Sequence, residues 1–252
     1  MLFLSRMDSM TATAASGLRA RMESLDLLAN NIANASTGGY KADREFYSLY
    51  VGEDAAGSDG SSTMPLIERP WVDHAQGALR PTGNPLDLAI SGSGFFAVNG
   101  PNGPLYTRNG SFHLGAGGEL LSADGYAVRD SAGTTPGVAL TLRAGRPIDV
   151  TSDGTIMQDG VAAGKLEIVD FTSTAGLSKQ GHSYFHTSDP SLKPTAAAGA
   201  SVAQGQLESA NTGTAEAAVR LVSVMRQFEM LQKAVSLGMD MNKKAIDEVA
   251  KV

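Results

Sequence analysis

The sequence contains no cysteine, which excludes a disulfide framework and any cysteine-ligated metal site. It has 20 Lys and Arg against 26 Asp and Glu, so the formal charge is 20 − 26 = −6 at pH 7, and the basic residues form no block. Nucleic acid and anionic membranes attract basic patches, so neither is expected as a partner. The longest uncharged stretches, Leu88–Thr107 and Pro194–Leu207, are broken by residues such as Gly, Pro, Asn and Ser, so no membrane-spanning helix is expected.

The start of the chain lacks the hydrophobic region of a cleavable signal peptide, because Arg6 and Asp8 cut off the short apolar run Met1–Ser5. If the protein is exported, we therefore expect another route. The 252 residues leave room for one or two domains with a hydrophobic core. Glycine is frequent, at 29 residues, whereas aromatic residues make up only 6%, a balance that favours turn-rich β structure.

Residues 4–32 repeat apolar or small side chains at alternating spacings of three and four, as a heptad helix does, with Arg21 interrupting one position. Polar side chains that compete for backbone hydrogen bonds and two glycines follow, which predicts the end of the helix. We expect one helix of about thirty residues. Its seam is Leu4, Met7, Thr11, Ala14, Leu18, Leu25, Leu28 and Ile32, and the terminating residues are Asn30, Asn31, Asn34, Ser36, Thr37, Gly38 and Gly39.

The C-terminal segment repeats the heptad pattern more regularly. Asn211–Thr214 supplies capping side chains before it, and Glu216 places a negative charge in the first turn, where the helix dipole favours one. On the seam, Asn242 is a polar residue of the kind that fixes register, and Gly238 allows two backbones to approach closely. The predicted seam comprises Thr214, Ala217, Leu221, Val224, Phe228, Leu231, Val235, Gly238, Asn242, Ala245, Val249 and Val252.

Two fates are open to these terminal helices. Most amphipathic helices pack their apolar stripe on the body of their own domain. Here the alternation of three and four is narrow and is sustained at both ends of the chain, which favours helices that coil with each other or with neighbouring subunits.

Between the helices the hydrophobic period changes to two, as in Leu86, Leu88 and Ile90. Four dipeptides of the type I′ hairpin class accompany it, Asn109–Gly110, Asp124–Gly125, Asp153–Gly154 and Asp159–Gly160. The strands expected around them are Phe95–Val98, Leu105–Arg108, Ser111–Leu114, Tyr126–Arg129, Ile148–Val150 and Leu166–Phe171.

The sequence therefore predicts an α+β fold, in which N- and C-terminal heptad helices pair as a coiled coil and a central, mainly antiparallel β domain lies between them in the chain. Two segments are interpreted as connections: Glu53–Thr63 is poor in apolar residues and is expected to be a mobile loop, and Ala196–Ala203 is expected to be a small-residue connector. The expected divisions are 1–37 for the first helix, 38–80 for a linker, 81–205 for the β domain and 206–252 for the last helix.

No catalytic, cofactor or metal site is predicted. His182 and His186 have a metal-like spacing of four, but their surroundings indicate a strand, which would hold them about 13 Å apart. The segment Gly92–Ala97 fits a loose dinucleotide fingerprint, yet strand residues follow where the fingerprint needs a helix, so a tight turn or bulge is expected. No phosphate-binding loop or nucleophile-elbow motif occurs.

Three runs of residues resemble the bacterial flagellar basal-body rod and hook proteins. The central run is Thr82–Phe96 (TGNPLDLAISGSGFF), followed by Tyr106–Phe112 (YTRNGSF), Gly118–Leu120 and Asp124–Tyr126. The run Ala29–Lys41 (ANNIANASTGGYK) is similar to the family's N-terminal signature. Leu207–Asn211 (LESAN) resembles its C-terminal "LE.SNV", with Ala210 in place of Ser and Thr212 in place of Val. The matching residues singled out are Asn30, Asn31, Asn34, Thr37, Gly39, Tyr40, Thr82, Gly83, Asn84, Pro85, Asp87, Gly92, Gly94, Phe95, Phe96, Thr107, Arg108, Gly110, Glu208 and Asn211.

The resemblance implies a structural axial component of the flagellum and not an enzyme. Such proteins are exported through the flagellar type III apparatus without a cleaved signal peptide and assemble in the periplasm with copies of themselves and with other proximal and distal rod proteins. It also implies that the terminal helices form an inner coiled-coil layer of a torque-transmitting tube. Within the family, Ala35–Thr37, Arg226–Met230 and the modest length look more like the proximal rod type, FlgF, than the distal type, FlgG.

The central motif residues are expected to define turns and core. Under the resemblance, the assembly residues are the seam positions Leu4, Met7, Leu18, Leu25, Leu28, Ile32, Leu221, Val224, Phe228, Leu231, Val235, Asn242 and Val249. Two other hypotheses stay open at this stage. The chain could be a secreted β-domain binding module whose helices oligomerise it, or a hydrolase with an unrecognised carboxylate pair.

Overall fold

The computed structural model describes residues 2–45, 47–51, 63–67, 70–132 and 137–249. The chain divides into two compact units, each described here by itself. The helical unit comprises Met1–Ala33, Asp43–Val72 and Gly213–Val252, and the β unit comprises Asn34–Ala42 and Asp73–Thr212.

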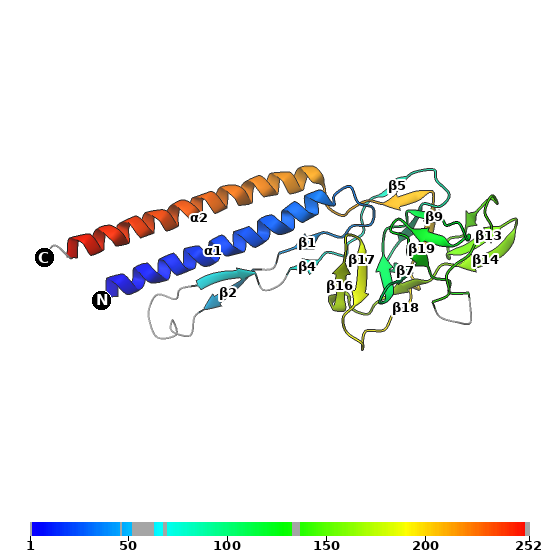
Figure 1. The fold of residues 1–252 in the computed structure, drawn as a ribbon, viewed down its shortest axis with the longest axis horizontal. Helices are drawn as coiled ribbons and strands as arrows, with labels where there is room; N and C mark the ends of the chain where they lie inside the picture. Colours follow the sequence, from blue (N-terminus) through cyan, green and yellow to red (C-terminus); the bar gives the residue numbers. More distant parts are fainter. Residues whose placement is uncertain (1, 46, 52–62, 68–69, 133–136, 250–252) are drawn as a thin grey trace. The chain divides into compact units, whose positions relative to one another are not determined.

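The helical unit is built on two long helices, α1 (Leu2–Ala33) and α2 (Thr214–Val249), which lie side by side and run in opposite directions (Figure 1). Helix α1 ends at Ala33, before the polar residues and glycines of 34–39, where termination was expected. The terminal helices contact each other and the strand pairs are antiparallel, so the predicted α+β class is confirmed.

Two short strand pairs complete the helical unit. Strand β1 (Asp43–Arg44) pairs with β4 (Trp71–Val72), and β2 (Tyr47–Val51) pairs with β3 (Thr63–Ile67), which contacts α1. The predicted mobile loop Glu53–Thr63 lies outside the described residues except for Thr63. That residue begins β3, so the loop prediction is wrong there, because Thr63 takes part in the ladder opposite Val51.

In the β unit the largest sheet has the strand order β16-β17-β8-β7-β11-β10-β9, and β15 pairs with both β7 and β18. Smaller sheets are formed by β12-β13-β14, by β19 with β6, and by β20 with β5. The strands are β5 (Leu79–Pro81), β6 (Leu88–Ser91), β7 (Phe95–Gly100), β8 (Gly103–Thr107), β9 (Phe112–Leu114), β10 (Leu120–Ser122), β11 (Ala127–Val128), β12 (Asp149–Val150), β13 (Thr155–Gln158), β14 (Val161–Lys165), β15 (Ile168–Asp170), β16 (Leu177–Gln180), β17 (Tyr184–Thr187), β18 (Thr195–Ala196), β19 (Ser201–Gln204) and β20 (Gln206–Glu208), with a 3₁₀ turn, η2 (Thr174–Gly176), before β16.

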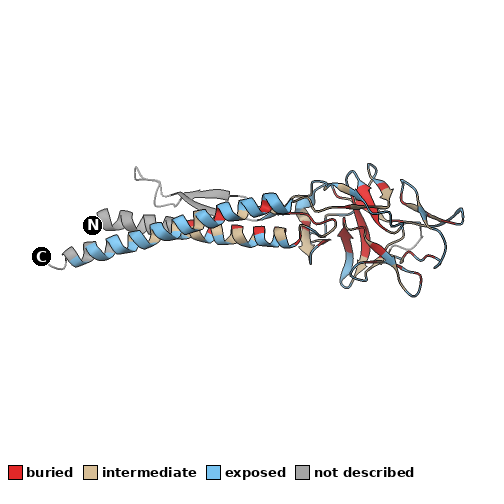
Figure 2. Ribbon diagram, turned by 90° about the horizontal axis from the view of Figure 1, so that it is seen from above, coloured by how far each residue is buried: buried red, intermediate tan, exposed pale blue. Residues whose placement is uncertain are grey.

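The core of the β unit is a continuous apolar cluster to which the sheets contribute together. Figure 2 shows buried residues gathered in this unit, whereas buried positions are scattered along the helices. Phe96 is fully buried and meets the ring of Phe112 edge to face, with ring centroids 5.2 Å apart. The cluster consists of Leu88, Ile90, Phe96, Val98, Leu105, Phe112, Leu120, Val128, Leu140, Leu142, Ile156, Leu166, Tyr184 and Val202.

Three of the four predicted hairpin turns join paired strands. Asp159 and Gly160 connect β13 and β14, and both have positive φ (53° and 78°), as a type I′ turn requires. At Gly125 and Gly154 the hairpins form, but the preceding aspartates do not have positive φ.

The predicted hairpin at Asn109–Gly110 is wrong. The flanking strands β8 and β9 do not pair with each other, because β8 pairs with β7 and β17 while β9 pairs with β10. Gly110 is needed for a different reason: a Cβ atom there would lie 1.7 Å from the carbonyl oxygen of Leu88. The amide of Leu88 also donates to the carbonyl of Gly110, at 3.0 Å.

Two smaller expectations are also corrected. The connector predicted at Ala196–Ala203 is partly strand, since Ser201–Gln204 forms β19 and pairs with β6. The strand predicted around the histidine pair begins only at Tyr184, so His186 lies in β17 but His182 lies in the preceding turn. The turn predicted at Gly92 and Gly94 is confirmed by their positive φ angles of 97° and 128°, and strand β7 follows it.

Candidate functional site

The predicted seam residues whose side chains are described are at least partly covered, apart from the exposed Thr214 at the start of α2. Leu28 and Val224 are buried, and Gly17 of α1 faces Leu231 of α2 so closely that a Cβ on the glycine would lie 3.5 Å from Leu231 Cδ1. The half-buried seam positions are Leu18, Leu25, Ile32, Leu221, Phe228, Leu231 and Val235. Leu4, Met7, Asn242 and Val249 lie in the two helices, but their side chains are outside the described part of the structure.

The most buried stripe of α1 is one that the sequence analysis missed. It consists of Gly17, Ala20, Ser24, Leu28 and Asn31, which are spaced by three or four residues. All but Leu28 are small or polar, so a search for large apolar side chains passes over them. The small residues permit close approach of the backbones, and their spacing is the signal that could have revealed them.

Asn31 joins α1 to the first strand of the helical unit. Its Nδ2 donates to the carbonyl of Asp43 at 2.8 Å, and its Oδ1 accepts from the amide of Asp43 at 2.9 Å. One buried side chain therefore satisfies both backbone groups of the residue that begins β1. This gives the second asparagine of the ANN motif a positional role within the unit.

A second apolar stripe runs along α2 and stays exposed. At 100° per residue it lies on the side of α2 opposite Ala217, Val224 and Leu231, which are the covered positions. Its apolar members are between 49% and 72% exposed. The stripe, called here the α2 stripe, is Val219, Val222, Arg226, Met230, Lys233, Leu237 and Met241. A helix with apolar stripes on two opposite faces has a surface for a second partner.

The first turns of the α2 stripe form a shallow groove whose lining is mainly apolar. The groove is lined by Val219, Val222, Met230 and Arg226. Its remaining lining residues are Ala218, Ser223 and Gln227. Arg226 is exposed and is the charged side chain of this groove.

Helix α1 carries a groove of the opposite charge, called here the α1 groove. It is lined by Glu23, Asp26, Leu27, Asn30 and Asp43, with Pro70 beside them. Leu27 and Pro70 supply apolar surface, and the three carboxylates supply negative charge. The pair between Glu23 and Arg19, at 3.4 Å, is exposed, so it contributes little to stability.

A buried ion cluster lies in the β unit where three sequence motifs meet. The ammonium of Lys41 lies 2.6 Å from Glu208 Oε1, and the guanidinium of Arg108 lies 3.3 Å from Glu208 Oε2. The side chains of Lys41 and Glu208 are fully buried, and that of Arg108 is 5% exposed. We call these three residues the motif junction.

Backbone groups supply further hydrogen-bond partners to the junction, although Arg108 Nε is buried without one. Lys41 also donates to the carbonyl of Ala75 at 2.7 Å, and Glu208 Oε1 also accepts from the amide of Gly77 at 2.8 Å. Arg108 donates to the carbonyls of Ile90 and Gly92. Burial lowers the pKa of Lys41 and of Arg108, and the carboxylate of Glu208 opposes both shifts. The cluster is a well-coordinated structural element, because each charge has several partners.

Asn211 and Gly39 extend the junction along the backbone. Asn211 Nδ2 donates to the carbonyl of Asp73 at 2.7 Å, and its Oδ1 accepts from the amide of Ala42 at 2.8 Å. Gly39 donates its amide to the carbonyl of Glu208 at 2.7 Å. It has a φ of 65°, and a Cβ there would lie 2.3 Å from the Arg108 backbone, so only glycine fits.

The other motif residues of the β unit make contacts within the fold. Asn84 accepts from the amide of Leu86 and donates to Asp87 Oδ1, forming a side-chain turn. Thr107 donates to the carbonyl of Ser183 at 2.7 Å. Thr82 and Gly83 donate their amides to the carbonyl of Gly205, and Thr37 donates to the carbonyl and side chain of Asn34. Tyr40, Phe95 and Phe96 are buried, while Pro85 is exposed in a turn.

Comparison with known proteins matches three segments of the chain to flagellar families. Residues 12–41 match the flagella basal body rod protein family, residues 89–162 match the flagellar hook protein FlgE/F/G D1 domain, and residues 203–248 match the C-terminal region of the flagellar basal body rod FlgEFG proteins. Among whole proteins, the chain is 30% identical to the flagellar basal-body rod protein FlgF of Caulobacter vibrioides, over 90% of this chain and 92% of the relative. The chain belongs to the flagellar basal-body rod protein family.

Relatives of two rod types are comparably similar. The FlgF protein of Mesorhizobium japonicum is 30% identical over 81% of this chain and 83% of its own length, and the FlgG protein of Agrobacterium fabrum is 31% identical over 91% and 95%. This rod protein is therefore a structural protein of the FlgF/FlgG family. The family is non-enzymatic, which confirms the prediction that the chain is not an enzyme.

The three matched segments meet in the motif junction of the rod protein. Lys41 belongs to the first segment, Arg108 to the second and Glu208 to the third. The sequence analysis named Arg108 and Glu208 as motif residues but gave them no partner. Arg108 and Lys41 lie 100 and 167 positions from Glu208 in the chain, so no local pattern indicates that these residues pair. The available hint was the presence of one acidic and two basic residues inside largely uncharged motifs.

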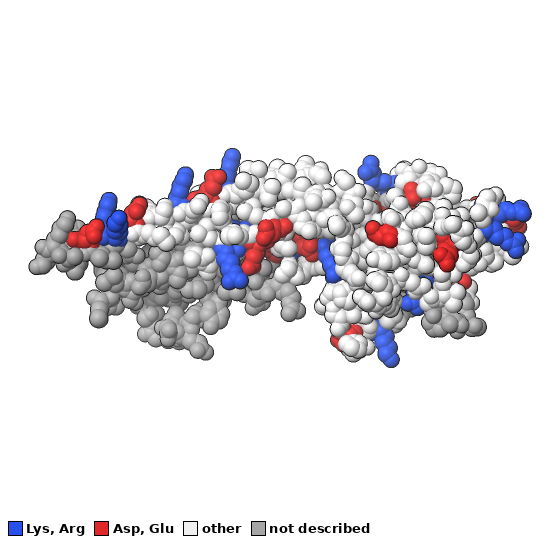
Figure 3. All heavy atoms as spheres, in the orientation of Figure 1, with Lys and Arg blue, Asp and Glu red and all other residues white. Residues whose placement is uncertain are grey.

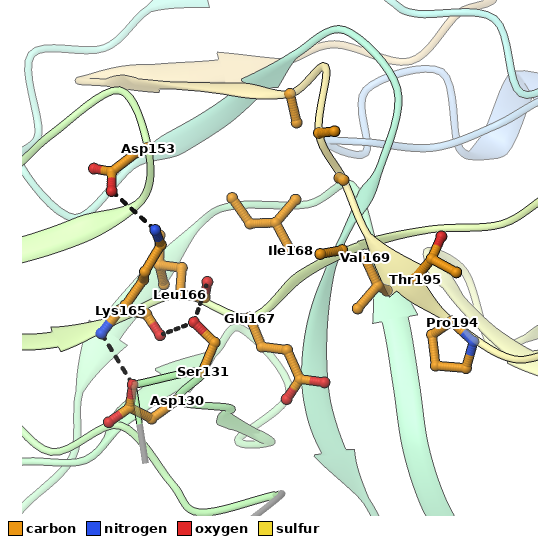
Figure 4. Close-up of a pocket in the computed structure, with 14 residues that line it drawn as sticks. Asp130, Ser131, Asp153, Lys165, Leu166, Glu167, Ile168, Val169, Pro194 and Thr195 are labelled. Atoms are coloured by element: carbon orange, nitrogen blue, oxygen red, sulfur yellow. Dashed lines mark hydrogen bonds and ion pairs between the residues drawn. The ribbon is translucent and has the colours of Figure 1, made fainter. Parts of the chain in front are cut away.

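A cleft in the β unit is lined by polar groups that bind one another. In Figure 4, Lys165 reaches Asp153 and its backbone amide reaches Asp130, while Ser131 turns to the backbone beside it. Hydrogen bonds from Thr151, Lys165 and Thr155 hold the pKa of Asp153 well below its usual range. Within the described residues no group of three or more His, Asp or Glu could hold a metal ion.

Among the described residues on the face drawn in Figure 3, basic and acidic side chains are interspersed among uncharged ones. Within the described residues no helix is long and apolar enough to cross a membrane. Rod family membership implies assembly with other rod proteins, so the exposed helix surfaces are the features to explain.

Proposed function

We propose that this rod protein is a proximal rod subunit of the FlgF type, and that its terminal helices assemble it into a helical tube that transmits torque for motility. In this proposal the helices of the segments 1–37 and 206–252 are the assembly arms, and 81–205 is the main part of the β domain. The predicted linker 38–80 and the residues 206–212 also contribute to the β unit, because 34–42 and 73–212 form one compact unit. Export through the flagellar type III apparatus without a cleaved signal peptide, followed by assembly in the periplasm, belongs to the same proposal.

The α2 stripe is the observation that carries the assembly role. Its five apolar side chains are exposed on a helix whose opposite face already packs on α1. Burying an apolar side chain of this size contributes roughly 1.5–3 kcal/mol, so several such contacts made at once stabilise a stiff array. Each subunit that presents different surfaces on two sides can add to the next without closing a ring, as a rod requires.

The FlgF assignment is supported by the segments Arg226–Met230 and Ala35–Thr37. The alternative is a distal rod subunit of the FlgG type. The assembly mechanism is the same for both, so the two differ in where along the rod the subunit lies.

Deleting the gene in the source bacterium tests this proposal. We expect non-motile cells whose basal bodies, imaged by electron microscopy, end within the proximal part of the rod, and full motility when the native gene is restored. A rod that is complete up to its distal part would instead indicate the FlgG type. Normal motility in the deletion strain, with no paralogue in the genome, would contradict the rod role itself.

A stripe variant separates assembly from folding in the same strain. Substituting both Met230→Glu and Leu237→Glu places charges on the α2 stripe, and we expect folded, exported protein that does not restore motility. The matched control is Met225→Glu, an exposed methionine on another face of the same helix. Restoration of motility by the double variant would contradict the role of the stripe.

A further inference from the structure

The α2 stripe and the α1 groove are complementary in charge. The charged members of the stripe are Arg226 and Lys233, both basic, whereas the groove displays the carboxylates of Glu23 and Asp26. Two copies meeting stripe to stripe would oppose cations to cations. A stripe that meets a groove instead opposes unlike charges, and such complementarity selects one arrangement over the others.

We propose that the α2 stripe of one copy docks on the α1 groove of a second copy of this chain. The proposal rests on the proposed rod function and identifies the two faces that meet. Arg226 is placed against Asp26 and Glu23, because a guanidinium can donate to two carboxylate oxygens at once. Val222 and Met230, one turn before and after Arg226, then cover the apolar surface of Leu27 and Pro70.

The acidic side chains are available for this contact at low cost. Asp26 is exposed, and the carboxylate of Glu23 is 44% exposed in its pair with Arg19. An exposed pair of this kind contributes little, so exchanging Arg19 for the neighbour's Arg226 costs little. Asp43 is held by Asn31 through its backbone, which fixes one wall of the groove.

The two faces lie on different helices of one unit, so every copy offers both. A contact between unlike faces leaves one free stripe and one free groove at the ends of any assembly. It does not close as a symmetric dimer, and it propagates into an open helical array wherever the rotation between copies does not close a ring. This is the type of growth that a rod needs.

The absence of cysteine from the chain makes the contact directly testable. Two full-length single-cysteine variants, Asp26→Cys and Arg226→Cys, are mixed in equal amounts and oxidised with oxidised glutathione, which accepts the electrons of the two thiols. We expect the disulfide between the two variants to exceed both homodimers. In the control, Asp26→Cys is mixed with the off-stripe variant Lys243→Cys, and we expect several-fold less mixed disulfide. The proposal would be overturned if the homodimer of the Arg226→Cys variant dominated the product. It would also be overturned if the native chain stayed monomeric, or if no mixed disulfide formed at concentrations at which the native chain sediments as oligomers.

A charge exchange provides the second measurement. Arg226→Glu is expected to weaken self-association by roughly ten-fold in sedimentation velocity, and adding Glu23→Arg and Asp26→Arg to the same chain is expected to restore it. Lys243→Glu should leave association unchanged. If Arg226→Glu weakens assembly but the exchange does not restore it, the groove assignment fails while the stripe and the rod function stand. If the Arg226→Cys variant, carrying a thiol-attached photo-cross-linker, labels a different rod protein alone in purified basal bodies, the proposal for a second copy is likewise overturned.

Discussion

The two units of this rod protein handle the same residue type in opposite ways. Leu140 in the β unit is completely buried, whereas Leu237 in the helical unit is 62% exposed. In the described part of the helical unit the buried apolar residues are Ala20, Leu28, Ala217 and Val224, most of them small. The β unit has a core of its own, while the helical unit leaves the large apolar side chains of the α2 stripe exposed.

The units differ in charge placement as well. The β unit buries one carboxylate between two cations and surrounds all three with backbone partners. The helical unit has one nearly buried carboxylate, Glu45, 3.7 Å from Arg220, and displays other charges in exposed grooves. The buried cluster supports the fold of the β unit, whereas exposed charges of the helices are the ones used in the proposed contact between copies.

The largest effect is expected from Glu208→Ala. Removing the carboxylate leaves Lys41 and Arg108 buried without their anion, which typically costs about 3–5 kcal/mol of unfolding free energy. Urea unfolding of the full chain measures this loss. Arg146→Ala is the control, since its pair with Asp159 is exposed on both sides and its loss should cost less than about 1 kcal/mol. Similar effects of both variants would show that the junction does not stabilise the β unit.

A matched pair of leucine substitutions tests the comparison itself. Leu140→Ala removes a fully buried side chain and should cost about 2–5 kcal/mol, because a cavity is left in the core. Leu237→Ala should change the unfolding free energy by less than about 0.5 kcal/mol but reduce assembly. Urea unfolding and sedimentation velocity on both variants separate the two properties. A strong destabilisation by Leu237→Ala would indicate that the stripe is covered within the free chain.

A pH dependence follows from His74 in the β unit. It packs against Phe95 and Phe185, with ring centroids 5.7 and 5.0 Å away, and burial followed by the nearby cations, Lys41 first, lowers its pKa from 6.5 to about 4. Between about pH 6.5 and pH 4 the His74 imidazole binds a proton in the unfolded chain but stays neutral in the folded chain. The stabilising contribution that is present above pH 6.5 is therefore lost as the pH falls towards 4.

Relative to His74→Leu, the native chain should therefore lose about 1–3 kcal/mol of unfolding free energy between about pH 7 and pH 4. Urea unfolding of both chains across this range measures the difference, and the comparison cancels the carboxylates that titrate in the same range. Parallel pH profiles for the two chains would show that folding does not lower the pKa of His74.

How far the sequence could predict this structure depends on the range of each interaction. The helices were predicted to within a few residues, because heptad spacing, Asn-rich termination and the cap before Thr214 are local signals. The turn at Asp159 and Gly160 was predicted for the same reason. Gly110 was assigned to a hairpin turn. It is needed instead because the backbone of Leu88, which is distant in the chain, leaves no room for a Cβ, and no local pattern shows this contact.

The candidate surfaces follow the same rule. The motif junction joins residues separated by up to 167 positions and could be found only from the fold. The α2 stripe had a local signal, since its spacings of three and four can be read directly, but the more regular seam on the opposite face of α2 dominated the pattern. The small-residue stripe of α1 was missed because Gly17 and Ser24 carry no hydrophobic signal.

The smallest expected effect belongs to that stripe and concerns how closely the helices approach. Glycine in a helix is about 1 kcal/mol less favourable than alanine, and a Cβ at Gly17 would lie in ordinary contact, 3.5 Å from Leu231. Gly17→Ala should therefore stabilise the helical unit by about 0.5–1 kcal/mol, measured as thermal unfolding followed by helical circular dichroism, and Ala29→Gly on the exposed face should destabilise it by a similar amount. If Gly17→Ala destabilises the unit while Ala29→Gly behaves as expected, the helices must pack more closely at Gly17 than a methyl group allows, and the glycine is then required by the contact with α2.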